Sequence, residues 1–394
     1  MSKYVFLCMP AHGHLNPTLA VAQELVARGE EVIYYLPESF RATIEATGAT
    51  FRGYEMSGGN FAASWNKNIS FLALFPAILS LSRRLMPQIL TWLDDDRPDY
   101  IFYENMSIWA RIAMSKLHIP GIRFSPTYVS FKQSSQGEMQ GLQKIKAAMV
   151  EIAGDLRDLC NDYGIPVIEP QELFTHNDQL NIVFLPRLFQ PDGEAFDERF
   201  VFVGPSISPR HDATNFPLHQ LKLGKVLYIS LGTVFNNQAE FFNRCFAAFK
   251  DQPWQVVLSR GTRLDESALD PIPENFLVAP FVPQLAVLER AQIFVTHGGM
   301  NSTMESLYYG VPMVAVPQMP EQAMTARRVQ ELGLGIALSP EQLSSELLRD
   351  SVIRVAQDPS YRERVQEMQK AVHEAGGYKQ AADAIIRFSR TQHE

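Results

Sequence analysis

The sequence contains few cysteines, and they form no motif. Cys8, Cys160 and Cys245 are the only three, they lie far apart, and no two of them form a CxxC pair. This pattern argues against a disulfide framework and against a zinc site. It favours three small buried side chains in a reducing compartment.

Long hydrophobic runs and basic clusters are missing as well. The apolar run at residues 4–9 is followed at once by Pro10 and the polar segment 11–14, without a small-residue cleavage site, so a buried strand explains it better than a signal peptide. The run at 71–81 contains Pro76 and is too short to cross a bilayer. The net charge is -8, and no Lys/Arg run interrupts it. We therefore expect a soluble cytoplasmic protein without nucleic-acid or membrane partners.

The length and the order of apolar segments predict two α/β domains. A chain of 394 residues with 46% hydrophobic and 20% charged residues is globular and too long for one ordinary core. Strand patterns alternate with helical patterns such as residues 17–28, which end at Gly29. Repeated strand–helix–strand units imply parallel sheets with helices on both faces. The expected strands are residues 5–8, 31–35, 100–102, 121–124, 180–185, 225–230, 255–258, 276–278, 293–296 and 312–316.

A polar, proline-containing stretch separates the two series of strands. We expect a first domain at 1–207, a linker at 208–222 and a second domain at 223–375. Residues 360–390 read as helices broken at Gly376-Gly377, and the final segment 376–394 is expected to pack back toward the first domain. Ligands of open parallel sheets bind beyond the carboxyl ends of the strands, so those loops are where chemistry is expected.

The segment 296–305 combines groups that suit a nucleoside diphosphate. A strand ends at Thr296, Gly298-Gly299 permits close backbone approach, and Asn301, Ser302 or Thr303 is expected to cap a new helix. The positive end of that helix suits a diphosphate, and His297 can add a hydrogen bond. Glu305 lies one turn past Asn301, where its carboxylate can accept hydrogen bonds from both ribose hydroxyls.

Two histidines follow the first expected strand. His12 and His14 precede a helix, at the edge of the sheet where ligands bind. Transfer of a group to a hydroxyl needs a base near neutral pH, and imidazole is suited to that task. Packing or loop hydrogen bonding is the alternative role for His12, which is the secondary candidate.

The chain resembles the family 1 glycosyltransferases, the group of plant natural-product enzymes and bacterial macrolide glycosyltransferases. The resemblance is carried by segments 12–17, 184–204, 230–233, 281–284, 296–305, 310–312 and 319–322, and it covers essentially the whole chain. It is strongest to small bacterial macrolide and flavonoid glucosyltransferases. The resemblance implies the α/β fold called GT-B, in which two Rossmann-like domains face each other with a cleft between them.

The resemblance also implies roles in binding a UDP-sugar. Phe281 stands where many members have a Trp that stacks on uracil, and Val282 offers backbone groups to the uracil edge. Gln284 and Glu305 hold the ribose. Glu321 and Gln322 occupy the usual Asp-Gln place, which contacts the sugar hydroxyls. The groups that surround the diphosphate are His297, Gly299, Asn301, Ser302, Ser230, Gly232 and Thr233.

The same resemblance selects the catalytic pair. It favours His14 as the base, with Glu104 in the place of a family Asp that orients the imidazole. Asn16 can cap the first helix and is implied to contact the donor. The implied reaction is a single displacement, so an α-linked donor gives a β-product. No Asp-x-Asp motif lies in a suitable loop, so we expect neither a metal nor another cofactor.

The first half also holds residues that suit a flat apolar acceptor. An aromatic, methionine-containing pocket fits phenolic compounds or macrolides, although core packing is the expected role of any single member taken alone. Ser125 and Thr127 follow a strand and are weaker candidates for donor or acceptor contact. The aromatic and methionine candidates are Phe61, Trp65, Phe75, Met106, Trp109 and Phe131.

The expected partners are therefore a UDP-sugar and a small apolar hydroxylated acceptor, for a monomer or weak homodimer. A nucleotide-sugar epimerase and a non-catalytic UDP-sugar-binding protein remain alternatives. A dehydrogenase is disfavoured, because residues 9–14 contain no Gly-x-Gly-x-x-Gly.

Overall fold

The chain divides into two compact units. The computed structural model describes residues 1–394 except 56–73, 130–138, 209–215, 222–224, 233–235 and 393–394. Unit 1 comprises Met1–Ser208 together with Ala375–Glu394, and unit 2 comprises Pro209–Glu374. The first division lies beside the expected linker, and the second lies beside the Gly376-Gly377 break.

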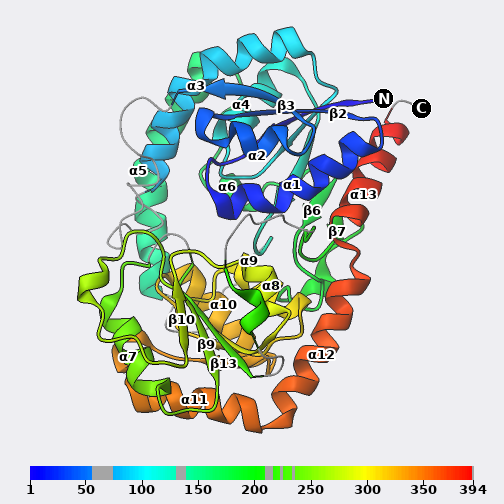
Figure 1. Ribbon diagram of the computed structural model, residues 1–394. Helices are drawn as coiled ribbons and strands as arrows, with labels where there is room; N and C mark the ends of the chain where they lie inside the picture. The colour runs from blue at the N-terminus through cyan, green and yellow to red at the C-terminus, as the bar shows by residue number, and fades with distance from the viewer. Residues whose placement is uncertain (56–73, 130–138, 209–215, 222–224, 233–235, 393–394) are drawn as a thin grey trace. The chain divides into compact units, whose positions relative to one another are not determined.

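Unit 1 contains a seven-stranded parallel sheet in the order β3-β2-β1-β4-β5-β6-β7 (Figure 1). Its strands are β1 (Lys3–Leu7), β2 (Glu31–Pro37), β3 (Thr50–Tyr54), β4 (Tyr100–Tyr103), β5 (Gly121–Ser125), β6 (Asn181–Val183) and β7 (Phe200–Phe202). Its α-helices are α1 (His12–Ala27), α2 (Arg41–Glu45), α3 (Leu74–Asp96), α4 (Ile108–Leu117), α5 (Met139–Tyr163), α6 (Glu172–Thr175) and α13 (Gly377–Thr391).

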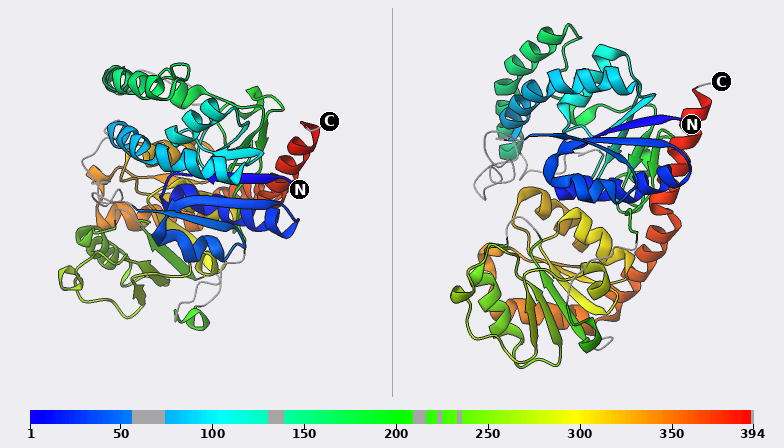
Figure 2. Two further views of the ribbon diagram at one scale, coloured as in Figure 1. Left: turned by 90° about the horizontal axis from the view of Figure 1, so that it is seen from above. Right: turned by 45° about the horizontal axis from the view of Figure 1, so that its top comes forward.

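Alternating side chains of this sheet enter two separate cores. Val5 and Leu7 face a core that contains residues of α3, α4 and α5, and α3 and α5 lie side by side (Figures 1 and 2). Tyr4 and Phe6 face the opposite core, which contains residues of α1, α2 and α13. A strand buried on both faces explains the continuous apolar run at the start of the sequence.

The C-terminal helix belongs to unit 1 although it follows unit 2 in the sequence. Gly376 and Gly377 adopt positive φ values of +83° and +59°, a conformation that L side chains rarely adopt. The Gly377 N–H donates to the Val203 carbonyl, and α13 packs on α1. The chain thus returns to unit 1 at the glycine pair.

Unit 2 contains a six-stranded parallel sheet in the order β10-β9-β8-β11-β12-β13. Its strands are β8 (Val226–Ser230), β9 (Gln255–Ser259), β10 (Phe276–Ala279), β11 (Ala291–Thr296), β12 (Met313–Ala315) and β13 (Gly335–Ala337). Its α-helices are α7 (Ala239–Phe249), α8 (Gln284–Leu288), α9 (Met300–Tyr308), α10 (Pro320–Glu331), α11 (Ser345–Gln357) and α12 (Pro359–Glu374).

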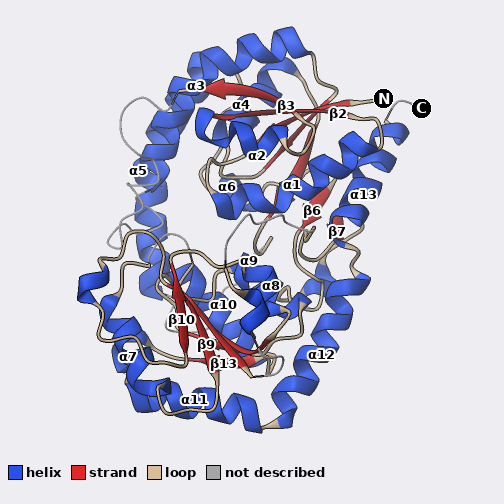
Figure 3. Cartoon of the chain, in the orientation of Figure 1, coloured by secondary structure: helices blue, strands red, loops and turns tan. Residues whose placement is uncertain are grey.

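Helices cover both faces of the second sheet. Figure 3 shows α7 and α11 on one side and α8, α9 and α10 on the other. Leu227, Ile229 and Val295 point into the α7–α11 core. The intervening Tyr228 and Phe294 therefore belong to the face of α8 and α9. Both units have the strand order of a Rossmann fold, as the sequence predicted.

The structure corrects two helix starts. Helix α1 begins at His12 after the extended residue Ala11, so the expected start at Pro17 and the capping role of Asn16 are wrong, and Pro17 lies inside the helix. Helix α9 begins at Met300 after Gly299, which carries no capping side chain, so Asn301 lies inside the first turn rather than at the cap. The same holds for Ser302 and Thr303.

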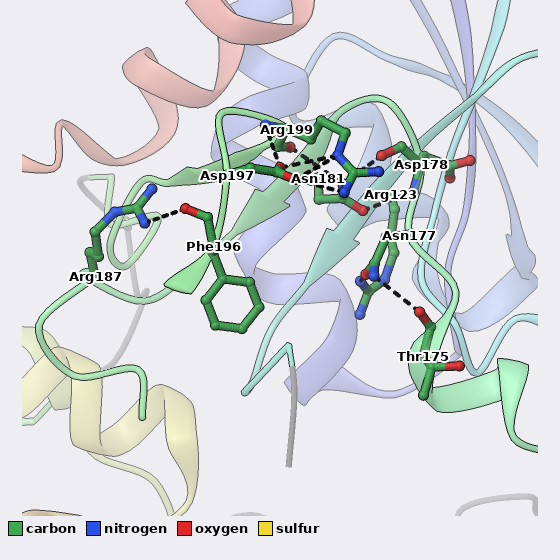
Figure 4. Close-up of polar contacts among 9 residues, drawn as sticks. All are labelled: Arg123, Thr175, Asn177, Asp178, Asn181, Arg187, Phe196, Asp197 and Arg199. Atoms are coloured by element: carbon green, nitrogen blue, oxygen red, sulfur yellow. Dashed lines mark hydrogen bonds and ion pairs between the residues drawn. The ribbon is translucent and has the colours of Figure 1, made fainter. Parts of the chain in front are cut away.

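Arginine side chains form hydrogen bonds with the loops around the short strands of unit 1. Figure 4 shows Arg187, whose Nη1 donates to the Phe196 carbonyl at 3.0 Å. The buried Arg123 on β5 donates from Nη1 to Asn177 Oδ1 at 2.6 Å, and burial lowers the pKa of Arg123 to about 10. These contacts stabilise the fold next to the strand-end loops.

Within the described residues, every helix is too short or too polar to cross a membrane.

Candidate active site

The two units carry candidate residues at equivalent places. In unit 1 the strand order reverses between β1 and β4, which pair directly, with Leu7 opposite Tyr103. In unit 2 it reverses between β8 and β11, with Ser230 opposite Thr296. Ligands of such sheets bind outside the carboxyl ends at these switch points. His14 and Glu104 follow the first pair of strands, and Gly232 and His297 follow the second.

His14 and Glu104 are joined by a side-chain hydrogen bond. His14 lies in the first turn of α1, and its Nδ1 contacts Glu104 Oε2. Glu104, which directly follows β4, is 3% exposed, and its Oε1 accepts a hydrogen bond of 3.0 Å from the Met9 backbone N–H. The extra methylene of Glu relative to Asp therefore does not prevent contact. Two donors from the same edge of the sheet hold this carboxylate.

This contact decides which imidazole atom can act as a base. An ionised carboxylate only accepts hydrogen bonds, so the Nδ1 of neutral His14 carries the proton. Nε2 is then the atom with a lone pair for proton abstraction. The His14 side chain is 24% exposed, so the ring reaches the surface while its orienting partner is buried.

His12 and Asn16 lie on the same helix but not in this pair. The exposed His12 ring contacts the Phe40 ring edge-on, with centroids 5.4 Å apart. This packing agrees with the secondary role assigned to His12. Asn16 is partly buried inside α1.

In unit 2, His297 is held between two glycines. A Cβ built on Gly232 would lie 2.7 Å from both Cε1 and Nε2 of the ring, and a Cβ on Gly299 would overlap Nε2 and lie 2.9 Å from Cε1. Gly232 also has φ +76°. The ring thus occupies the space that a side chain would need on either side. This brings His297 beside Gly299, the residue that caps α9.

The same surroundings keep the His297 ring neutral. Burial lowers the pKa of His297 from 6.5 to about 4, and a hydrogen bond with the Ser230 backbone opposes this only in part. At neutral pH the ring is therefore uncharged and carries a single N–H. The start of α9 lies next to it, with Asn301 and Ser302 in the first turn, where the backbone N–H groups point out of the helix end. This arrangement can bind a diphosphate through neutral donors and the helix dipole.

The expected ribose residues form one polar chain. Tyr228 on β8 donates to Gln284 Oε1 at 2.9 Å, and Gln284 Nε2 donates to Glu305 Oε2 at 2.5 Å. Gln284 Nε2 also lies 3.4 Å from Ser302 Oγ. Glu305 is 6% exposed on α9, one turn from Asn301. The sequence placed Gln284 and Glu305 together, and the structure brings them into contact.

The remaining donor candidates lie around these groups. The Phe281 side chain is exposed by 57%, and Val282 is partly buried before α8. Glu321 and Gln322 lie in the first turn of α10. Gln322 Oε1 accepts a hydrogen bond of 2.7 Å from the Gln318 N–H, which fixes the orientation of its amide.

Other hydrogen bonds hold the loop after β8. The Gly232 N–H donates to Ser230 Oγ at 3.2 Å, and the Gly232 carbonyl accepts a bond of 3.0 Å from Asn236. Thr233 lies outside the described residues.

The acceptor candidates separate into three groups. Trp109 and Phe75 are 1% and 2% exposed within the α3–α5 core, which agrees with the core role favoured for any one of them. Met106 is partly buried against that core, and Ser125 Oγ donates to the Thr127 carbonyl at 2.8 Å. The candidates outside the described residues are Phe61, Trp65 and Phe131.

The sequence interpretation missed three participants. The backbone N–H of Met9 carries no side-chain signal, and Tyr228 sits inside an apolar strand where it resembles core. Asn236 lies in a loop with several polar residues, which hides the one that bonds Gly232. Each is identified only by spatial contact. Among the described residues, no cluster of three or more His, Cys, Asp or Glu could hold a metal ion.

Comparison with known proteins agrees with this arrangement. The family model described as UDP-glucoronosyl and UDP-glucosyl transferase matches residues 223–377. NDP-glycosyltransferase YjiC of Bacillus licheniformis is 40% identical, covering 96% of this chain and 96% of that protein. Demethyllactenocin mycarosyltransferase of Streptomyces fradiae is 34% identical, covering 98% of this chain and 86% of that protein.

A solved structure extends the agreement to the fold. The crystal structure of the glycotransferase of kitacinnamycin matches with a TM-score of 0.86 and 31% identity, covering 98% of this chain and 99% of that one. With the two Rossmann-like sheets and the sequence relatives, the chain belongs to the UDP-glucoronosyl and UDP-glucosyl transferase family and is a glycosyltransferase with the GT-B fold.

Proposed function

We propose that this glycosyltransferase moves a sugar, glucose in the first instance, from a UDP-sugar to a hydroxyl of a small apolar acceptor such as a flavonoid or macrolide. The observation that carries the proposal is the contact between His14 Nδ1 and the buried Glu104 carboxylate at the switch point of unit 1. It gives the imidazole the tautomer and orientation that proton abstraction needs.

The proposed reaction is a single displacement with inversion. His14 Nε2 accepts the acceptor's hydroxyl proton as that oxygen forms a bond to the anomeric carbon. The bond from this carbon to the UDP oxygen breaks, and UDP leaves with the electron pair. Glu104 stabilises the imidazolium that forms, which lowers the barrier for proton transfer. Attack opposite the leaving group turns an α-linked donor into a β-linked product.

The donor contacts follow from unit 2. Phe281 stacks on uracil, and Val282 offers backbone groups to the edge of the base. Gln284 and Glu305 bind the ribose, while Glu321 and Gln322 contact the sugar hydroxyls. The diphosphate lies against His297 and the first turn of α9, which stabilise the charge that develops on leaving UDP. Because these groups are protein donors, the proposed transfer needs no metal.

A product assay tests this function directly. Purified protein is incubated with UDP-glucose and a panel of flavonoids and macrolides in the presence of EDTA, and mass spectrometry follows the gain of one hexose. The anomeric proton coupling in the product's NMR spectrum then distinguishes a β-linkage from an α-linkage. Hexose transfer with a β-linkage is expected. An α-linked product contradicts the inverting mechanism, and binding of UDP-glucose without transfer to any acceptor favours a non-catalytic role.

The two neighbouring histidines supply a matched pair of variants for the base. His14→Ala should lower transfer by about 100-fold or more while UDP binding, measured by calorimetry, is retained. His12→Ala removes an exposed ring that contacts Phe40 and should leave transfer within a few-fold of wild type. Equal activity of His14→Ala and wild type contradicts the assignment of His14.

A further inference from the structure

Tyr228 is the buried end of the polar chain that reaches the ribose residues. Its side chain is 1% exposed, and its ring stacks on Phe294 of β11 with centroids 4.5 Å apart and planes 8° from parallel. Burial raises the pKa of Tyr228, so the phenol keeps its proton. The ring is held by packing, and its hydroxyl is directed at Gln284.

The chain of hydrogen bonds has only one consistent direction. The Glu305 carboxylate accepts and does not donate, so the amide N–H₂ of Gln284 must face it. The amide oxygen then faces Tyr228, whose O–H must donate. Tyr228 and Glu305 thus fix the orientation of the Gln284 amide from its two ends, and the amide in turn holds Glu305.

We propose that Tyr228 is a positioning residue for recognition of the donor ribose: its hydroxyl, acting through Gln284, holds the Glu305 carboxylate in place for the ribose 2′-hydroxyl. The inference rests on the proposed function, which assigns the ribose to Gln284 and Glu305. An ionised carboxylate can accept about four hydrogen bonds, so the bond from Gln284 does not exhaust Glu305. Tyr228 therefore contributes to selectivity for ribonucleotides over deoxyribonucleotides.

Removal of the phenol oxygen should weaken this selectivity more than it weakens binding in general. In Tyr228→Phe the ring stack on Phe294 is kept, but the buried Gln284 carbonyl loses its donor. The amide is then held only through its N–H₂ end, so the Gln284 side chain can shift and Glu305 is positioned less precisely. The uracil contacts do not pass through this chain, and the diphosphate residues touch it only through Ser302, whose Oγ lies 3.4 Å from Gln284 Nε2.

The test compares the dissociation constants of UDP and 2′-deoxy-UDP by calorimetry, which requires no knowledge of the acceptor. Wild type should bind UDP about tenfold or more tightly than 2′-deoxy-UDP, as expected for a hydroxyl bonded to a carboxylate. In Tyr228→Phe this ratio should fall by about three- to tenfold. Tyr4→Phe is the matched control, because it removes another buried hydroxyl from a stacked tyrosine, the partner of Ser389 in unit 1. Its ratio should equal that of wild type.

Two further variants separate failure of the inference from failure of the proposed function. Glu305→Gln should abolish most of the selectivity, and adding Tyr228→Phe to it should cause no further loss. If Glu305→Gln retains the wild-type ratio, the ribose assignment in the proposed function is wrong. If Glu305→Gln abolishes the preference for UDP over 2′-deoxy-UDP but Tyr228→Phe retains the wild-type preference, the role of Tyr228 is overturned. Should Tyr228→Phe fail to fold, Gln284→Ala at the start of α8 interrupts the same chain and must lower the ratio.

Discussion

Substitution of Gly299 by alanine tests the packing around His297 with a single added methyl group. Gly299 has φ −63° and ψ 140°, which alanine adopts without strain, so the change acts only through the space that Cβ occupies. That Cβ would overlap His297 Nε2 and lie 2.9 Å from Cε1 and 3.2 Å from Cδ2. The ring must therefore move by about 1 Å before ordinary contact is restored.

A displacement of this size would break the proposed hydrogen bond from His297 to a phosphate oxygen. A bond to a charged group contributes about 1.5–3 kcal/mol, so the dissociation constant of UDP should rise by about 10- to 100-fold in Gly299→Ala. Calorimetry measures the affinity, and thermal unfolding checks that the protein remains folded. Gly154→Ala is the control, because no atom lies within 4 Å of its new Cβ, and UDP affinity should not change.

A double variant reveals whether the methyl group acts through the ring. His297→Ala alone should weaken UDP binding to a similar extent, and Gly299→Ala added to it should cost little more, since the ring is already absent. A large additional loss in the double variant refutes this reasoning. It would mean that the new methyl group collides with the diphosphate itself.

The remaining predictions concern the base, the nucleobase and pH. Glu104→Gln removes the charge that stabilises the protonated His14, so transfer should fall about tenfold or more in steady-state assays with UDP affinity unchanged; an unchanged rate would contradict the pairing. Phe281→Ala should weaken UDP binding by about five- to 100-fold by calorimetry, the range for loss of a base stack, without altering the unfolding midpoint, because the side chain is 57% exposed. Burial holds the pKa of His297 at about 4 against 6.5 in the unfolded chain, so the unfolded state binds more protons between these values. The free energy of unfolding therefore keeps its full contribution from the neutral ring above pH 6.5 and falls by up to about 3 kcal/mol as the pH is lowered toward 4. In urea unfolding, His297→Asn should lose less stability than wild type over this pH range.

The sequence predicted the central strands better than it predicted the ends of the elements. The central strands are apolar runs buried on both faces, and that pattern is distinctive. The edge strands β3 and β13 contain Gly53 and Gly335 and pair on one side only, so they carry no comparable run and were not predicted. Pro17 suggested a helix start because proline is common there, whereas α1 begins five residues earlier and tolerates the ring inside.

In the candidate site too, the sequence predicted contacts that follow from the strand order but not contacts that depend on loop packing. The contact of His14 with Glu104 follows from two loops that leave neighbouring strands, an adjacency that the Rossmann order implies. The enclosure of His297 between Gly232 and Gly299 cannot be predicted from the motif, because the Gly298-Gly299 pair in the sequence does not show where Gly232 lies. It depends on where the loop after β8 lies. Long-range packing of this kind leaves no periodic signal in the sequence.

The chemistry of the donor side follows from the absence of cations among its assigned residues. None of the residues assigned to the nucleotide is Lys or Arg, Glu305 and Glu321 are acids, and His297 is neutral because burial lowers its pKa to about 4. In the proposed site the diphosphate would then be held by N–H dipoles and the start of α9, which act at short range and are fixed before the substrate arrives. A buried cation there would bind the diphosphate strongly both in the ground state and in the transition state. Oriented neutral donors instead favour the charge that develops on UDP as its bond to the sugar breaks. In this proposal the glycines beside His297 contribute to catalysis, because they would fix the direction in which the uncharged ring faces the diphosphate.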